Sequence, residues 1–119
     1  MDTTAAPALA ALLGRYSVSP KHLGEPGPDD EALLTAFAAA LRAPDHGSLI
    51  PFRFVLIRGA GLERLAMLFQ DYARRRGKHP EEIAAERPRA MQAPVVIAVV
   101  ARIDPQHEVP AHEQWMAVG

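Results

Sequence analysis

The sequence contains no cysteine among its 119 residues. Disulfide bonds, thiol catalysis and metal sites built from thiolates are therefore excluded. A chain without cysteine also fits a reducing compartment, so we expect a cytoplasmic protein. The amino terminus carries Asp2 and no early basic residue, which is not typical of a secretory signal peptide.

Neither sign of charge dominates the composition. The 13 lysines and arginines nearly balance the 14 acids, which leaves a net charge of −1. A chain this close to neutral gives no reason to expect nucleic acid or an anionic membrane as a partner. No apolar run approaches the roughly 20 residues that cross a bilayer, so no membrane span is predicted.

The remaining composition is that of an ordinary globular chain. Hydrophobic residues make up 49% and charged residues 23%, both close to the average for globular domains. A chain of 119 residues has room for one domain at most. The sequence shows no internal repeat, domain linker or low-complexity segment, so we treat it as one unit.

Apolar spacing and helix-ending residues predict five helices and two strands. The helices are expected at 5–14, at 29–43, through 62–72 with Gly77 as its end, at 79–94 with a break near Pro88, and from Pro110 onward. Proline and glycine predict an extended loop at 15–28. The strands are expected at 52–58 and 94–101.

These elements do not close a domain by themselves. The strand at 94–101 is apolar throughout, which predicts burial on both faces and further strands beside it. Only the strand at 52–58 is available as a neighbour. The last helix carries Trp115 and Met116, which we expect in a core. The chain therefore looks like the first part of a larger α+β domain, completed by further residues or by a partner chain.

One corner of the sequence holds polar residues between two apolar elements. In RAPDHGSLIPFRFVLI, residues 42–57, a helix-like segment ends in Arg42 and a strand-like run follows Pro51. Arg42 can be a cation at a helix C-terminus, where it opposes the helix dipole. His46 in an Asp-His-Gly turn can be a solvated turn residue.

The corner at 42–59 resembles that of the FMN-dependent nitroreductase family, in its small, single-domain NAD(P)H nitroreductase group. RYSVS at 15–19 resembles the family's Arg-x-Ser signature after the first helix. Three further segments follow in the family's order: LGEPGPDDEAL at 23–33, QAPVVIAVVARID at 92–104 and HEVPAHEQWMAVG at 107–119. The resemblance spans nearly all of residues 9–119.

The resemblance implies an α+β nitroreductase-type fold, with a mixed sheet flanked by helices. Residues 1–119 would be the N-terminal part of a single domain, about two-thirds of it. It also implies an obligate homodimer with FMN held between the subunits. The implied reaction moves electrons from NAD(P)H through FMN to a nitroaromatic, a quinone or a similar small-molecule acceptor.

The resemblance also assigns residues to the cofactor. Arg15, Tyr16 and Ser17 match positions at or beside the flavin phosphate, and Arg42 and His46 match positions that reach the flavin bound mainly to the other subunit. Arginine, hydroxyl and backbone N–H groups are the usual means of holding a phosphate. A cation near a reduced flavin stabilises the negative charge that it gains.

The sequence departs from the family at the first of these sites. The family often has two adjacent arginines where Arg15 and Tyr16 stand, and another basic residue soon after Ser17. Lys21 is the nearest substitute for that cation. Without the resemblance, Arg15 and Ser17 could equally be a salt bridge and a turn.

Other interpretations use different residues. A truncated, inactive remnant of the fold would act at most as an interaction partner. A small helical nucleic-acid binder would use the basic run at 74–78, although the neutral charge argues against it. His107, Glu108, His112 and Glu113 suggest a metal site, but their spacing straddles Pro110 and does not match one helical face. We therefore expect no metal.

Overall fold

The structure is a computed structural model that describes residues 5–119. Its elements follow the order helix, helix, strand, two helices, strand, helix, with two short 3-10 helices between them. They are α1 (Ala5–Gly14), η1 (Pro20–His22), α2 (Asp30–Ala40), η2 (His46–Ser48), β1 (Phe52–Arg58), α3 (Ala60–Arg75), α4 (Pro80–Ala90), β2 (Val95–Ala101) and α5 (Ala111–Val118). All five expected helices and both expected strands are present.

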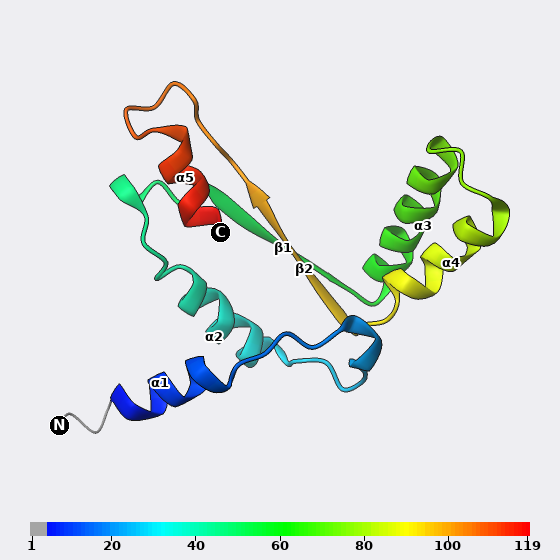
Figure 1. Ribbon diagram of the computed structural model, residues 1–119, viewed down its shortest axis with the longest axis horizontal. Coiled ribbons are helices and arrows are strands. Elements are labelled where there is room, and N and C mark those ends of the chain that lie inside the picture. The colour runs from blue at the N-terminus through cyan, green and yellow to red at the C-terminus, as the bar shows by residue number, and fades with distance from the viewer. Residues whose placement is uncertain (1–4) are drawn as a thin grey trace.

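The two strands form one antiparallel pair at the centre of the molecule (Figure 1). Phe52 lies opposite Ala101 and Arg58 lies opposite Val95, so all seven residues of each strand are paired. No tight turn connects them. The chain leaves β1, runs through α3 and α4, and returns along β2.

The α3–α4 pair extends from one end of the strands (Figure 1). α3 buries Leu62, Ala66 and Ala73, which recur on one helical face. Most of that face is filled by small residues, so the two helices can approach closely. An ion pair between Arg87 of α4 and Glu63 of α3, at 2.6 Å, adds a polar link between them.

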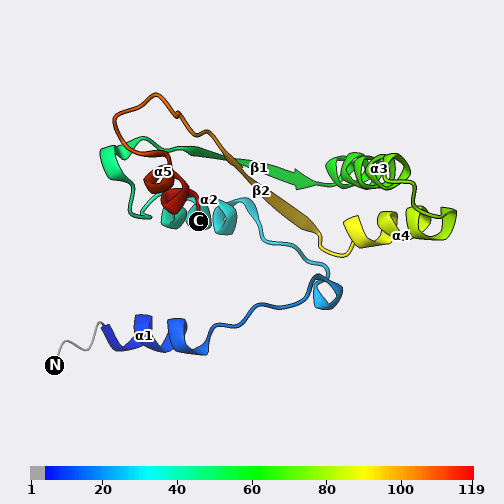
Figure 2. The ribbon, with the colours of Figure 1, turned by 45° about the horizontal axis from the view of Figure 1, so that its top comes forward.

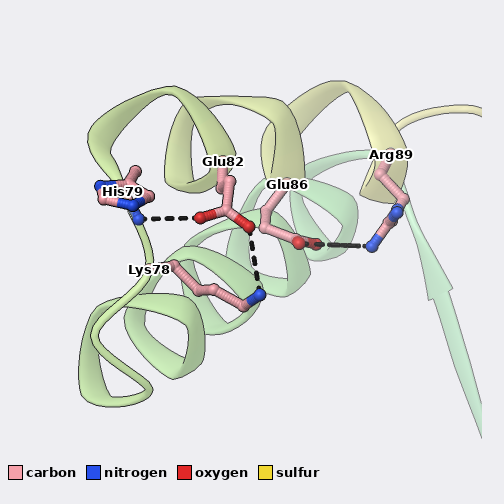
Figure 3. Close-up of polar contacts among 5 residues, drawn as sticks. All are labelled: Lys78, His79, Glu82, Glu86 and Arg89. Atoms are coloured by element: carbon pink, nitrogen blue, oxygen red, sulfur yellow. Dashed lines mark hydrogen bonds and ion pairs between the residues drawn. The ribbon is translucent and has the colours of Figure 1, made fainter.

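Polar contacts define the start of α4. The carboxylate of Glu82 accepts a hydrogen bond from the backbone N–H of His79, at 3.0 Å, and pairs with the ammonium of Lys78, at 3.1 Å (Figure 3). These contacts hold the pKa of the Glu82 carboxyl below its ordinary value, the backbone hydrogen bond being the larger cause. A carboxylate in the first turn also suits the helix dipole.

The predicted break near Pro88 is wrong. α4 continues through Pro88 to Ala90. A proline removes one backbone donor and crowds the preceding turn, so Pro88 costs α4 a hydrogen bond without ending it, and the helix stops soon afterwards at Ala90. The N–H of Met91 then bonds to the carbonyls of Arg87 and Pro88, both at 3.2 Å, and closes the helix.

α2 packs against β1 through aromatic rings. The Phe37 ring stacks on Phe54 with centroids 4.8 Å apart and an angle of 21° between the planes. The guanidinium of Arg58 pairs with Asp30 at 2.6 Å, which ties the end of β1 to the start of α2. The Asp29 carboxylate accepts the N–H of Ala32 at 2.8 Å, so α2 has a regular N-cap.

α1 lies apart from the rest of the chain, as Figure 2 shows. Its leucine side chains are unusually exposed to solvent: Leu9 is 56% exposed, Leu12 70% and Leu13 79%. An alanine- and leucine-rich helix of this length is marginal in water without tertiary packing. The helix therefore presents an apolar surface that this chain does not cover within the described residues.

Two expectations about burial are wrong. No residue of β2 is fully buried, and Ile97 and Val99 are exposed. Trp115 is 55% exposed and Met116 76%, so neither lies in a core. The reason is the same for both. β1 covers only one edge of β2, and no layer of the described chain covers these side chains.

The dimensions agree with this openness. The radius of gyration is 18.3 Å, against about 13.5 Å for a compact domain of this length. The accessible surface is 9420 Å², against about 6,300 Å² for a folded monomer of this mass. The chain thus exposes about 3,100 Å² more than a closed domain would.

Candidate functional site

The corner between α2 and β1 is fixed by its own backbone contacts. The Asp45 carboxylate accepts the N–H of Ile50 at 2.7 Å, and the Asp45 carbonyl accepts the N–H of Ser48 at 3.0 Å. Gly47, Ser48 and Ile50 have φ angles of 75°, 51° and 47°. Left-handed backbone at a β-branched residue such as Ile50 is strained. Strain of this kind is concentrated at functional sites in proteins.

His46 is one of the exposed polar side chains of this corner. Its Nδ1 contacts a carboxylate oxygen of Glu113, which belongs to α5. The His46 side chain is 65% exposed and that of Glu113 is 34% exposed. The contact joins residues that are far apart in sequence, and Figure 1 places α5 at the same end of the strands as the corner.

α5 is held in place beside the corner by Gln114, which is 2% exposed. Its side-chain oxygen accepts the N–H of Asp104 at 2.8 Å. Its side-chain nitrogen donates to the carbonyls of Asp104, at 2.8 Å, and Val109, at 2.9 Å. Val109 in turn packs close to Gly47: a β-carbon added there would lie 3.3 Å from its side chain. Gln114 thus fastens the loop before α5, and that loop supports the turn.

Arg42 lies just beyond the end of α2, on the same corner. Its N–H bonds to the carbonyl of Ala39 at 3.0 Å, so the backbone is fixed while the side chain is exposed. Within residues 5–119 the guanidinium makes no ion pair. It is therefore available to an anionic or electron-rich ligand.

The second set of predicted residues lies in the loop after α1. The Arg15 guanidinium donates to the Ser17 hydroxyl at 3.4 Å, and both residues are exposed. Tyr16 between them is 78% exposed. The loop thus places a cation and a hydroxyl together on an open surface, and these are the groups that bind phosphate.

The structure does not bring the two sets together. Residues 15–17 make no hydrogen bond or ion pair with Arg42 or His46 in the described part of the chain. In both views α1 and the residues that follow it lie away from the corner (Figures 1 and 2). Within one chain the two sets of predicted residues therefore stay separate.

Other polar features have structural roles. His107 Nδ1 accepts the N–H of Val109 at 3.0 Å, and Glu113 contacts His46. Across residues 5–119, no three histidine or acidic side chains are arranged to hold a metal ion. In the basic run, Arg74 pairs with Asp71 at 2.5 Å and Lys78 pairs with Glu82 at 3.1 Å.

A pocket of about 240 Å³ lies between the loop before α2 and the start of β2. Its lining is apolar and contains no titratable side chain. The lining residues are Leu23, Gly24, Pro26, Gly27, Pro28, Ala93, Pro94, Val95 and Ile97. Ligand sites usually add a few converging polar groups to an apolar wall, so this pocket is a weaker candidate than the loop and the corner.

Two residues that support the corner have no sequence signal for that role. The spacing of Glu113 suggests only a metal ligand, and Gln114 belongs to no recognisable motif. Both lie in the first turns of α5, and nothing in their spacing indicates a partner more than 60 residues away, as in the contact of Glu113 with His46. Only the fold shows what they contact.

The sequence pattern of the Nitroreductase family matches residues 12–119, which is nearly the whole chain. The chain belongs to the nitroreductase family. Two bacterial relatives are similar to it. Putative NAD(P)H nitroreductase YdjA of Escherichia coli K12 is 38% identical over 112 residues, and Putative NAD(P)H nitroreductase of Haemophilus influenzae is 38% identical over 102 residues.

The same fold occurs in a solved nitroreductase-like protein. The crystal structure of the nitroreductase-like family protein from Bacillus cereus superposes with a TM-score of 0.67 at 23% identity, and the match covers 92% of this chain and 57% of that one. The expected α+β nitroreductase-type fold is confirmed.

This nitroreductase-family chain matches only part of the length of each relative. The match covers 94% of this chain and 60% of the Escherichia coli protein, and 85% of this chain and 55% of the Haemophilus protein. Among the helices of residues 5–119, none has the length and apolar character needed to cross a membrane.

Proposed function

We propose that this chain forms part of a single flavin-dependent oxidoreductase domain that uses FMN and NAD(P)H. Membership of the nitroreductase family supports the flavin chemistry. The names of its relatives, NAD(P)H nitroreductases, support the electron donor. The proposed acceptor is a nitroaromatic, a quinone or a similar small molecule.

The observation that carries this proposal is the pairing of Arg15 with Ser17. The guanidinium and the hydroxyl lie 3.4 Å apart on an exposed loop, with no acidic side chain bound to that arginine in the described residues. A phosphate monoester carries close to two negative charges and needs cationic and neutral donors. Arg15 and Ser17 supply one of each, so the residues present fit the phosphate end of FMN.

Arg42 and His46 complete the proposed site from a second subunit. Their separation from residues 15–17 within one chain supports this division. The uncovered surface supports it as well. Each chain exposes about 3,100 Å² more than a closed domain would. If each of two chains buried half of that excess surface, the interface would bury about 3,100 Å² in total, a size typical of obligate dimers. The proposed assembly is therefore a homodimer with FMN between the subunits.

The side chains of this chain place the cofactor rather than react. When bound, FMN supplies the two-electron chemistry, taking a hydride from NAD(P)H and passing electrons to the acceptor. Arg15 and Ser17 anchor the phosphate, and Tyr16 lies beside them. Arg42 brings positive charge toward the ring system. No side chain is required as a general acid, because solvent can deliver protons.

The test is direct. The purified chain is titrated with FMN while flavin fluorescence is recorded, and NADH- and NADPH-dependent reduction of a nitroaromatic is then measured. We expect saturable flavin binding. A chain that binds no FMN at any concentration, although its circular dichroism shows the expected helices, would favour the inactive remnant instead.

A further inference from the structure

We propose that Glu113 is a positioning residue that fixes the ring orientation and the tautomer of His46. This proposal deepens the function proposed above, because it concerns how one half-site presents its histidine to the flavin. No metal or catalytic role is assigned to Glu113. It acts only through the imidazole.

The contact itself is the first observation. The Nδ1 atom of His46 meets a carboxylate oxygen of Glu113. An ionised carboxylate can only accept hydrogen bonds, so Nδ1 must be the donor. The neutral imidazole then carries its proton on Nδ1, and Nε2 keeps its lone pair. Nε2 makes no hydrogen bond within residues 5–119, so it is the ring nitrogen that remains available to a ligand.

The second observation is that Glu113 is held in place. The next residue, Gln114, is buried and fastens the loop before α5 through three hydrogen bonds. Val109 of that loop packs against Gly47, the residue after His46. The backbone next to Glu113 and the backbone next to His46 are therefore both held in place by contacts other than the one between these two side chains.

The consequence is a division of roles between the two nitrogens. Nδ1 donates to Glu113 whether the ring is neutral or protonated. Nε2 accepts when the ring is neutral and donates when it is protonated. Nε2 is thus the one atom at which the ring can switch between accepting and donating a hydrogen bond when the charge on an electron-rich heteroaromatic cofactor changes. Carboxylates that orient a functional histidine in this way are well known at metal sites, and the same geometry operates without a metal.

The tautomer is measured first, without any cofactor. In the protein labelled with ¹⁵N-histidine, long-range ¹H–¹⁵N correlations distinguish the protonated ring nitrogen from the bare one. We expect the His46 proton on Nδ1 in the wild type and in Glu113→Gln, whose amide oxygen still accepts. In Glu113→Ala we expect it to move to Nε2. The matched control is Glu108→Ala, which removes an exposed carboxylate from the loop before α5 and should leave His46 unchanged.

The effect on flavin is measured second. We expect Glu113→Ala to weaken FMN binding about two- to fivefold, the range for an exposed charged pair. In a His46→Ala background the same substitution should change nothing further, because Glu113 acts through the ring. Equal losses in both backgrounds would overturn the proposal.

The two readouts keep the proposals separable. If no flavin binds, the proposed function fails while the tautomer measurement still decides the role of Glu113. If Glu113→Ala does not fold, the tautomer measured in the wild-type protein is sufficient, because a His46 proton on Nε2 there contradicts the assignment. A proton that stays on Nδ1 in a folded Glu113→Ala would equally contradict it.

Discussion

Arg15 carries a positive charge that no acidic side chain pairs with inside residues 5–119. If it anchors the FMN phosphate, Arg15→Ala should cost roughly 1.5–3 kcal/mol of binding free energy, the usual worth of hydrogen bonds to charged groups. The FMN dissociation constant would rise about 10- to 150-fold. Fluorescence titration of the two proteins measures the change.

The matched control is Arg75→Ala. Arg75 is also exposed and, in the described residues, also without an ion pair, but it lies on α3. Its loss removes the same net charge and should leave FMN affinity within about twofold, since a distant surface charge is screened. Equal losses in the two variants would mean that general charge, rather than the loop after α1, attracts the cofactor.

Glu82 gives a prediction about pH. Its folded pKa is lowered by the His79 N–H and by Lys78, so the folded state favours the ionised form. The stabilisation is fully present above the ordinary carboxyl pKa of 4.5 and is lost as the pH falls through the lower folded value. Glu82→Gln should lower the midpoint of thermal unfolding at neutral pH.

The difference between wild type and Glu82→Gln should vanish in acid, where both side chains are neutral. Thermal unfolding followed by circular dichroism over a series of pH values measures it. Glu81→Gln, one residue earlier, is the control, because the Glu81 side chain is exposed and makes no hydrogen bond or ion pair in the described part of the chain. A difference that persists unchanged in strong acid would rule out the ionic explanation.

At the level of elements, Asp29 is the clearest single determinant of a helix. Its carboxylate caps α2 by accepting the N–H of Ala32. Asp29→Ala should destabilise the chain by about 1 kcal/mol, with a range of 0.5–2 kcal/mol for such caps. Asp29→Asn should retain most of the stability, because its amide oxygen also accepts. Urea unfolding of the three proteins decides between a cap and a simple charge effect.

The elements themselves were largely predictable because local signals specify them. Gly77 follows the end of α3 as expected, and the β-branched and aromatic run from Phe52 to Arg58 forms β1 with the expected bounds. The prediction for Pro88 is wrong because the sequence does not show how far α4 continues beyond that proline. The prediction that β2 is buried is wrong for a different reason. The apolar side chains of β2 indicate a strand covered on both faces, but the sequence of the strand does not show whether other elements cover it.

The candidate site was predictable only in part. The motif around Arg15 and the corner around His46 could be recognised locally, from the types and order of their residues. The partner of His46 could not be recognised. Glu113 reaches that ring because β1 and β2 pair and return the chain to the corner. A contact of this kind depends on long-range topology, which local spacing does not reveal.

At the level of the whole molecule, the two half-sites predict complementation between subunits. A mixture of Arg15→Ala and Arg42→Ala chains should contain heterodimers in which one of the two sites has both arginines. At equal amounts and with free exchange, about one site in four would be intact. FMN titration of the mixture should therefore show a tight fraction that neither variant shows alone.

Subunit exchange must be confirmed in the same mixture, for example by energy transfer between differently labelled chains. If exchange occurs and no tight fraction appears at any ratio, Arg42 does not act across an interface. If either variant alone binds FMN as tightly as the wild type, its arginine is not part of the site.

The connection between β1 and β2 has a further consequence for how the chain reaches this structure. Arg58 and Val95 are paired, yet α3 and α4 lie between them in sequence. Bringing such distant segments together costs loop-closure entropy before any pairing is gained. The α3–α4 contacts are more local, so the helical hairpin can form first and bring the two strand ends together. Folding rates should therefore respond to substitutions such as Ala66→Gly in the hairpin more than to changes in β2, whose pairing completes later.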